Sequence, residues 1–181
     1  MKIAVYGKMR SGKTEVCNIL KDILKDVACL DFGDSLKECV KIMYPESIKK
    51  PKDRKLLIGV GQHMRKFDED IWVNALKNKI ENTLAQQIIV TGVRQKNEYE
   101  MLKKQGFIFL KVVSTDRERI KRCKKEGDNF DLSCMENETE KVLDTFEYSY
   151  KIDNIGDLAY LREEVKKFVA CLILAMAGKG E

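Results

Sequence analysis

One glycine-bracketed segment near the start of the chain carries the clearest chemical signal in the sequence. Residues 7–14 read GKMRSGKT, which fits the phosphate-loop pattern GxxxxGK[ST] at every position. Gly7 and Gly12 permit backbone angles, and a close approach to a ligand, that a Cβ atom would obstruct. The amides of such a loop and the N-terminus of the following helix point at an anion. The pattern predicts a nucleoside triphosphate site; the alternative is a Gly-rich turn with an incidental lysine.

The residues inside this loop have separate expected roles. Lys13 is expected to place a point charge on the β- and γ-phosphates, and the Thr14 hydroxyl to ligate Mg²⁺. The other loop residues expected to bind the nucleotide are Gly7, Arg10, Ser11 and Gly12. The expected cofactors are therefore ATP and Mg²⁺.

Short apolar segments that alternate with helical patterns must position this loop. The predicted strands, rich in β-branched and aromatic residues, are 2–6, 27–32, 87–91, 107–113 and 150–154. Apolar residues at a helical period, all expected to face the core, are Val16, Ile19, Leu20, Ile23 and Leu24; Ile71, Ala75, Leu76, Ile80 and Leu84; and Leu158, Leu161, Val165, Phe168, Val169, Leu172 and Ile173. This alternation favours a single three-layer α/β/α domain over residues 1–181, with a five-stranded parallel sheet covered by helices on both faces.

The composition excludes several classes of protein. The net charge of +5, from 34 Lys+Arg and 29 Asp+Glu, suits anionic small molecules and is too small to indicate nucleic-acid binding. The six cysteines include no CxxC pair and there is one histidine, so a zinc site is disfavoured and reduced thiols are expected. The apolar run 168–177 is too short to span a bilayer, and the N-terminus does not resemble a signal peptide.

We therefore expect a cytoplasmic protein that binds small-molecule nucleotide substrates, with no nucleic-acid and no membrane partner. The apolar C-terminal helix leaves a monomer and a homodimer both open.

The residues after the later strands decide the fate of the bound phosphate. A GTPase needs an NKxD-like guanine-reading segment, and none is present in the sequence. Motor and repair ATPases place an acid at the end of the third strand, which here reads QIIVTGVR. Small kinases remain, and these need a second pocket for the phosphate acceptor.

Ligands of parallel sheets bind beyond the carboxyl ends of the strands, so residues there are the next candidates. Asp34 comes after the second strand and is either a helix N-cap or a carboxylate that orients an attacking oxygen or holds Mg²⁺ through water. Arg94 comes after the third strand, where it would reach an acceptor phosphate. Glu98 is expected to cap the next helix or to pair with Arg94.

The basic connector after the second helix supplies further candidates. Arg54 and Arg65 flank the apolar LLIGVG and are expected at the ends of a buried segment, where their planar forks suit bidentate phosphate binding. Trp72 either packs in the core or stacks on a base. The lysines of residues 49–55 are interpreted as a solvated face.

The charge reverses sharply after the fourth strand. Residues 115–126 hold six Lys/Arg and three Asp/Glu, whereas residues 127–150 hold seven acids and one lysine. This pattern favours a basic lid over about 115–135 that keeps water from the phosphates; a salt-bridged amphipathic helix is the alternative. The predicted catalytic residues are Lys13, Asp34, Arg117 and Arg122, and Arg119 is predicted to bind the nucleotide.

Several of these segments together resemble the P-loop nucleoside monophosphate kinase superfamily, most closely the phage-type deoxynucleoside monophosphate kinases. The segments are GKMRSGKT, DFGDSLKE, RKLLIGVGQHMR with DEDIWVNAL, TGVRQKNE and YKIDNIGDLAYL. The resemblance implies a P-loop kinase fold with a small lid, an acceptor-binding insertion over about 34–84, and ATP-dependent phosphorylation of a (deoxy)nucleoside monophosphate to the diphosphate. It also implies an acceptor site lined by Arg54, Arg65, Trp72 and Arg94, and a lid bearing Arg117, Arg119 and Arg122.

The chain departs from this family at two places. Gly92 stands where the family often has an aspartate, and residues 136–150 contain only Thr139-Glu140 in place of a His-x-Ser-Glu-like element. The alternative functions are a kinase of another small acceptor such as dephospho-CoA, and a non-catalytic ATP-binding regulator, which Gly92 favours. A DNA-binding role for the connector lysines lacks an accompanying recognition motif.

Overall fold

A parallel sheet forms the centre of the molecule. The computed structural model describes residues 1–48, 54–125 and 138–178. The strands of the sheet are β1 (Lys2–Tyr6), β2 (Val27–Asp31), β3 (Gln87–Thr91), β4 (Ile108–Val113) and β5 (Tyr150–Asp153). They pair in the order β2-β3-β1-β4-β5, and every pairing is parallel. The predicted strands are confirmed, three of them one residue shorter than expected.

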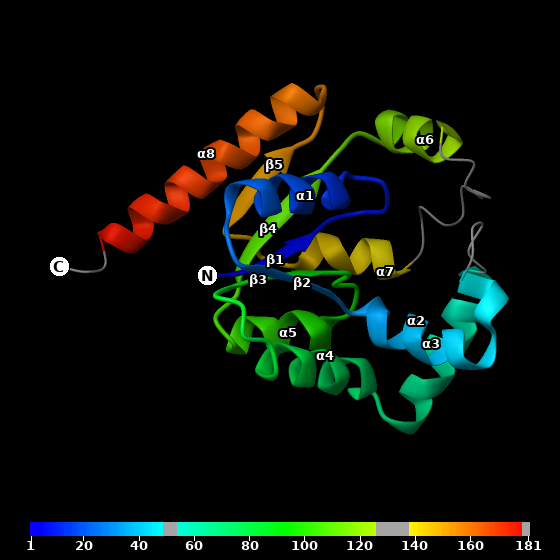
Figure 1. The fold of residues 1–181 in the computed structure, drawn as a ribbon. Helices are drawn as coiled ribbons and strands as arrows, with labels where there is room; N and C mark the ends of the chain where they lie inside the picture. Colours follow the sequence, from blue (N-terminus) through cyan, green and yellow to red (C-terminus); the bar gives the residue numbers. More distant parts are fainter. Residues whose placement is uncertain (49–53, 126–137, 179–181) are drawn as a thin grey trace.

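Helices cover both faces of this sheet. The helices of the described residues are α1 (Lys13–Ile23), α2 (Gly33–Met43), α3 (Arg54–Phe67), α4 (Ile71–Glu81), α5 (Lys96–Lys104), α6 (Asp116–Lys125), α7 (Glu138–Lys141) and α8 (Leu158–Ala177), with the 3₁₀ turns η1 (Pro45–Ile48) and η3 (Val142–Thr145). α1 and α8 lie over one face, and α4 and α5 lie over the other (Figure 1). The predicted three-layer α/β/α architecture is therefore confirmed.

The central strand β1 shows how the two faces are filled. Its side chains alternate, so Ile3 and Val5 pack in the cluster beneath α1 and α8, whereas Ala4 and Tyr6 pack in the cluster toward α4 and α5. All four side chains have no exposed surface. Burial on both faces makes β1 a rigid base for the loop that comes after it.

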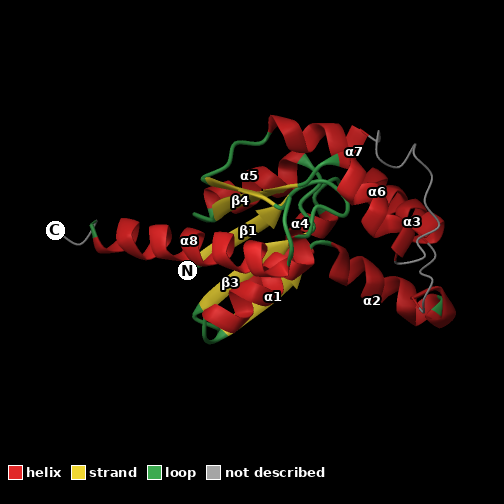
Figure 2. Cartoon of the chain, turned by 90° about the horizontal axis from the view of Figure 1, so that it is seen from above, coloured by secondary structure: helices red, strands yellow, loops and turns green. Residues whose placement is uncertain are grey.

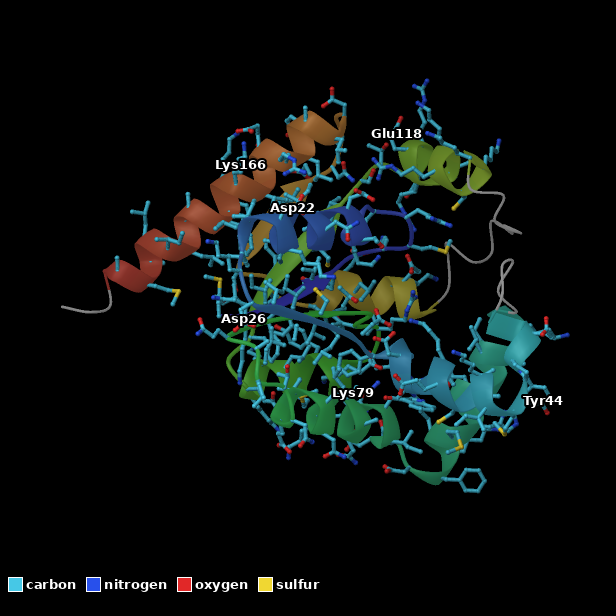
Figure 3. The ribbon with its side chains drawn as sticks, in the orientation of Figure 1. Asp22, Asp26, Tyr44, Lys79, Glu118 and Lys166 are labelled. Atoms are coloured by element: carbon cyan, nitrogen blue, oxygen red, sulfur yellow. The ribbon has the colours of Figure 1, made fainter. Side chains whose placement is uncertain are left out.

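The remaining elements gather where the strands end. α2, α3, α6 and α7 lie beyond the carboxyl ends of the strands, as Figure 2 shows from above. The Lys79 side chain of α4 reaches toward α2 (Figure 3), and its Nζ lies 2.8 Å from Glu38 Oε1. The carboxyl edge of the sheet is thus enclosed by helices that the chain contributes at several points.

Three predicted core positions are wrong because each lies at or beyond the end of a helix or beyond the sheet. Leu84 is 99% exposed, since α4 ends at Glu81. α8 extends past the sheet (Figure 1), which leaves Ile173 56% exposed, and Leu158 at the other end of the helix is 55% exposed. In the described part of the chain, no helix is both long and apolar enough to cross a membrane.

The middle of α8 should anchor the helix to the sheet. Phe168 has no exposed surface, and its ring lies 5.2 Å from that of Tyr150 on β5. We expect Phe168→Ala to lower the free energy of unfolding by about 3 to 5 kcal/mol, because it leaves a cavity. Urea denaturation measures this value. The control Ile173→Ala removes an exposed side chain and should change it by less than about 0.5 kcal/mol; equal losses would contradict the packing of α8.

Candidate active site

The glycine-bracketed loop joins β1 to α1 at the centre of the carboxyl edge. A Cβ atom on Gly7 would collide with the carbonyl oxygen of Val112, and one on Gly12 would collide with the Asn154 side chain. Gly12 also has a φ of 102°, in the left-handed region. Neighbouring strand ends therefore crowd the loop so closely that only glycine fits at these two positions.

Lys13 folds back over this loop. Its Nζ donates to the carbonyl oxygens of Gly7 and Lys8, each at 2.8 Å. Thr14, the next residue, lies exposed in the first turn of α1. The ammonium therefore sits above the cradle in which the sequence predicts the terminal phosphates.

Four charged side chains act on the Lys13 amine. Burial, with Arg94 and Arg119, lowers its pKa, whereas Glu140 and Asp31 act in the opposite direction; together they bring the pKa to about 8. Since these four charged residues come from four different segments, the tertiary structure sets the charge state of the amine.

Two arginines of α6 hold the backbone of the loop. Arg119 Nε donates to the carbonyl oxygen of Met9 at 2.7 Å, and Arg122 Nη1 donates to that of Arg10 at 3.1 Å. Arg119 is only 2% exposed, whereas Arg117 on the same helix is exposed. Arg119 and Arg122, predicted as lid residues that contact the nucleotide, thus bind the loop itself. Residues 126–135 of the predicted lid lie outside the described residues.

The end of β5 supports the same loop from its other side. Asn154 Nδ2 donates to the carbonyl oxygen of Ser11 at 2.9 Å, while the Asn154 carbonyl accepts from Ser114 Oγ at 3.0 Å. Asn154 is 4% exposed. No role was predicted for Asn154 from the sequence, although it ends the strand predicted over 150–154 and ligands bind at the carboxyl ends of such strands.

Glu140 is a buried acid at the centre of this network. It is 2% exposed, and its Oε2 accepts from the Met9 amide at 2.8 Å and from Arg119 Nη2 at 3.1 Å. Its Oε1 lies 3.6 Å from Arg94 Nη1. The sequence singled out the Thr139-Glu140 pair but predicted no contact for Glu140; the Thr139 side chain lies outside the described residues.

Two aspartates lie at the end of β2 and just after it, and Asp34 does not cap the helix, which was one of its two predicted roles. Asp34 is not a helix N-cap, because α2 begins at Gly33 with Phe32 in the capping position. Its Oδ2 accepts from the Asp31 amide at 3.1 Å, and its Oδ1 accepts from Lys37 Nζ at 2.8 Å. Asp34 therefore fixes the turn that presents Asp31.

Asp31 is an ionised carboxylate at the end of β2. Its burial favours a raised pKa, but the hydroxyl of Thr91, the Lys37 ammonium and the Gly33 amide together hold the pKa below its usual value. Thr91 Oγ1 donates to Asp31 Oδ2 at 2.6 Å across the β2–β3 pair. The carboxylate therefore stands at the same edge of the sheet as the loop.

Gly92 makes room for this carboxylate. A Cβ atom on Gly92 would lie 2.6 to 2.9 Å from the three carboxyl atoms of Asp31, and its φ is 78°. Position 92 has no acid of its own, but Asp31 of the neighbouring strand β2 places a carboxylate there.

The two described arginines predicted for the acceptor site, Arg65 and Arg94, pair with Glu98 and Glu140. Glu98 caps α5 by accepting from the Arg94 and Gln95 amides at 2.7 and 3.0 Å, as predicted. Its ion pair is with Arg65, whose Nη2 lies 3.2 Å from Oε1, and burial raises the pKa of Glu98. Arg94 is 51% exposed. Its guanidinium is therefore open to solvent at the sheet edge.

The connector before Arg65 forms α3, and the expectation of a buried segment there is wrong. Ile58 is 60% exposed. Arg54 begins this helix, and its side chain lies outside the described residues. Trp72 is 5% exposed and its Nε1 donates to the Gly61 carbonyl at 3.2 Å, so it packs α4 against α3. Base stacking by Trp72 stays a prediction.

A hollow of about 550 Å³ lies along α3. Its described lining residues are Lys55, Leu56, Gly59, Val60, His63 and Met64. They lie on the side of the helix opposite Gly61 and Arg65, since successive residues are 100° apart. None of the described loop residues lines this hollow, so we assign it no role in the site. The described residues also contain no group of three or more His, Cys, Asp or Glu side chains that would hold a metal ion.

Comparisons with known proteins agree with this geometry. A family model described as an AAA domain (AAA_18) matches residues 3–144. The chain belongs to the AAA_18 family. The uncharacterised protein ORF77 of Ictalurid herpesvirus 1 (strain Auburn) is 27% identical over 171 residues, which cover 92% of this chain and 69% of that protein.

Two solved structures share the fold of this AAA_18 member. Shikimate kinase from Acinetobacter baumannii, in complex with shikimate, has a TM-score of 0.60 at 19% identity, over 96% of this chain and 93% of that chain. A gluconokinase from Sinorhizobium meliloti 1021 has a TM-score of 0.58 at 14% identity, over 99% and 97%. The predicted P-loop kinase fold is confirmed.

The contact between Gly92 and Asp31 can be tested with a matched glycine. Gly106 has a similar φ of 75° but has open space where its Cβ would lie. Both alanine variants carry backbone strain of about 1 kcal/mol, and Gly92→Ala also crowds Asp31. We expect Gly92→Ala to lower the free energy of unfolding by about 1 to 2 kcal/mol more than Gly106→Ala in urea titrations. Indistinguishable losses would mean that Asp31 does not occupy this space.

Proposed function

We propose that the chain transfers the γ-phosphoryl group of ATP to a nucleoside or deoxynucleoside monophosphate. The observation that carries the proposal is the link from Arg94 to the phosphate loop: Glu140 Oε1 lies 3.6 Å from Arg94 Nη1, and Glu140 Oε2 accepts from the Met9 amide at 2.8 Å. After burial, Arg94 contributes most to lowering the Lys13 pKa, although it belongs to the acceptor side of the sheet edge. Cationic groups therefore flank the place where donor and acceptor phosphates would meet.

The donor half of the site needs a cation and an anion cradle. Lys13 neutralises the β- and γ-phosphates, while the loop and the N-terminus of α1 supply amides. The exposed Thr14 hydroxyl and the ionised Asp31 carboxylate are the oxygen ligands suited to Mg²⁺, which usually keeps waters and binds mostly through substrate phosphates. When bound, Mg²⁺ neutralises the charge that develops on the phosphates.

The acceptor half favours a phosphate over a hydroxyl group. A monophosphate oxygen is already ionised near neutral pH, so it attacks the γ-phosphorus without a general base as the bond to the β-phosphate oxygen breaks. Both carboxylate oxygens of Asp31 and of Asp34 already accept bonds within the protein. Neither aspartate therefore needs to act as a base in this scheme, and Arg94 would orient the acceptor phosphate.

The fold neighbours favour a second candidate. Shikimate kinase and gluconokinase are named for acceptors other than nucleotides. A kinase of such an acceptor would use Asp34 as the base for a hydroxyl group. A non-catalytic ATP-binding regulator was favoured by the lack of an acid at Gly92. The Asp31 carboxylate lies beside Gly92 and removes this reason.

A panel of acceptors separates these candidates. Purified protein with MgATP should convert at least one nucleoside or deoxynucleoside monophosphate to the diphosphate, read by product mass, and should leave shikimate, gluconate and dephospho-CoA unchanged. Arg94→Met should raise the KM for that monophosphate about 10- to 100-fold, because it removes a charged hydrogen-bond donor. Arg162→Met, which removes an exposed pair with Asp22, is the control and should match wild type. Turnover of shikimate or gluconate alone would replace the proposal with the second candidate.

The Lys13 amine predicts a pH dependence of nucleotide binding. Its pKa of about 8 in the folded protein compares with an ordinary 10.5, so the ligand-free protein loses this charge above pH 8. Affinity for MgATP, measured by calorimetry, should fall above that pH by up to about tenfold per unit. Between these two pKa values the unfolded chain binds more protons, so the same group makes the fold more stable as pH rises.

Lys13→Met is the control for this pH profile. It should bind MgATP weakly and without the step above pH 8. A wild-type affinity that stays constant to about pH 9.5 would show that Lys13 keeps its proton.

A further inference from the structure

We propose that Arg119 and Glu140 are a pair of positioning residues that fix the peptide groups of Met9 in the phosphate loop, and that Glu140 links this loop to Arg94. Only the link from Glu140 to Arg94 rests on the proposed function, because that function assigns Arg94 to the acceptor phosphate. Neither residue would touch the nucleotide in this role, which differs from the ligand contact predicted for Arg119.

The pair grips both polar backbone groups of one residue. Glu140 Oε2 accepts from the Met9 amide at 2.8 Å, and Arg119 Nε donates to the Met9 carbonyl at 2.7 Å. The two side chains also bond each other at 3.1 Å. The N–H and C=O of Met9 therefore have their directions set by one charged pair.

Burial strengthens the hydrogen bonds between this pair and Met9. Arg119 and Glu140 are each 2% exposed, and Arg119 Nη1 also donates to Asp116 Oδ1 at 2.8 Å. Bonds between charged groups strengthen out of water, and losing one partner leaves the other as an uncompensated buried charge. A loop held in this way has its backbone conformation fixed before the ligand arrives, so less binding energy is lost to ordering it.

The second oxygen of Glu140 extends the link to the acceptor side. Oε1 lies 3.6 Å from Arg94 Nη1, and Arg94 is half exposed. Glu140 therefore contacts the loop with one oxygen and Arg94 with the other, whereas Arg119 bonds Met9, Asp116 and Glu140 itself. This asymmetry distinguishes the effects expected when each residue is changed.

Four variants test the pair: Arg119→Met, Glu140→Gln, their double mutant, and Lys121→Met. Lys121 is an exposed cation on the same helix and serves as the matched control. The measurements are the Kd for MgATP without acceptor, the KM for ATP and for the monophosphate, and the melting temperature.

Arg119→Met should weaken MgATP binding about tenfold and change the acceptor KM less than twofold. Glu140→Gln should weaken MgATP binding and also raise the acceptor KM. The Kd of the double mutant for MgATP should not exceed the larger of the two single-variant Kd values, because the pair acts as a unit. Lys121→Met should match wild type in all of these values.

Two results would overturn the inference. A lowered melting temperature with a wild-type Kd for MgATP in Arg119→Met would mean that the residue only stabilises the fold. Independent effects that multiply in the double mutant would mean that the two residues do not act together. If Arg119→Met does not fold, Arg119→Lys replaces it; lysine keeps the charge but lacks the fork that reaches Met9 and Glu140 together, so a wild-type Kd there would overturn the pair equally.

The proposed function can fail separately. If the wild-type protein binds MgATP but phosphorylates no monophosphate, the acceptor assignment falls. The Kd measurements on Arg119, Glu140 and the control are made without acceptor, so they still decide whether the pair positions the loop.

Discussion

Five successive carbonyl groups of the phosphate loop, from Gly7 to Ser11, each accept a hydrogen bond from a side chain. A buried carbonyl without a partner is costly. Lys13 donates to two of them, and Arg119, Arg122 and Asn154 donate to the next three in succession. The rest of the site is arranged around this requirement.

The parallel sheet is what brings these donors together. Because all strands run in one direction, their carboxyl ends meet at one edge, and β1 lies between β3 and β4. The loop after β1 therefore has Thr91 and Arg94 on one side, and Ser114 and Asn154 on the other. On the first side, the Arg94 guanidinium is exposed to solvent. On the second side, the buried Asn154 donates to the Ser11 carbonyl of the loop.

The exposure of each arginine separates two kinds of role. Arg119 is 2% exposed, and its N–H groups donate to Met9, Asp116 and Glu140. Arg94, at 51%, holds one acid at 3.6 Å and faces solvent. The same residue type thus serves as internal scaffold in α6 and as an open cation beside the loop. Charge patterning alone treats both as basic residues near phosphates.

The sequence by itself determined the elements of this protein, because those signals are local. Alternation and apolar runs located the strands, and the glycine spacing located the phosphate loop, whose backbone allows few substitutes. The helical period also identified buried positions such as Leu161 and Phe168. It failed at Leu84 and Ile173, because a period does not say where a helix ends or where the sheet beneath it stops.

Only the tertiary structure decided which side chains form hydrogen bonds with the phosphate loop. Arg119 and Met9 are 110 residues apart, Glu140 and Met9 are 131 apart, and Asn154 and Ser11 are 143 apart. The sequence pattern therefore predicted a ligand contact for Arg119 and no contact for Glu140 or Asn154. It likewise indicated no acid beside Gly92, because that acid arrives from the neighbouring strand. A side chain's type fixes which bonds it can make, but the packing of distant segments fixes which partner is within reach.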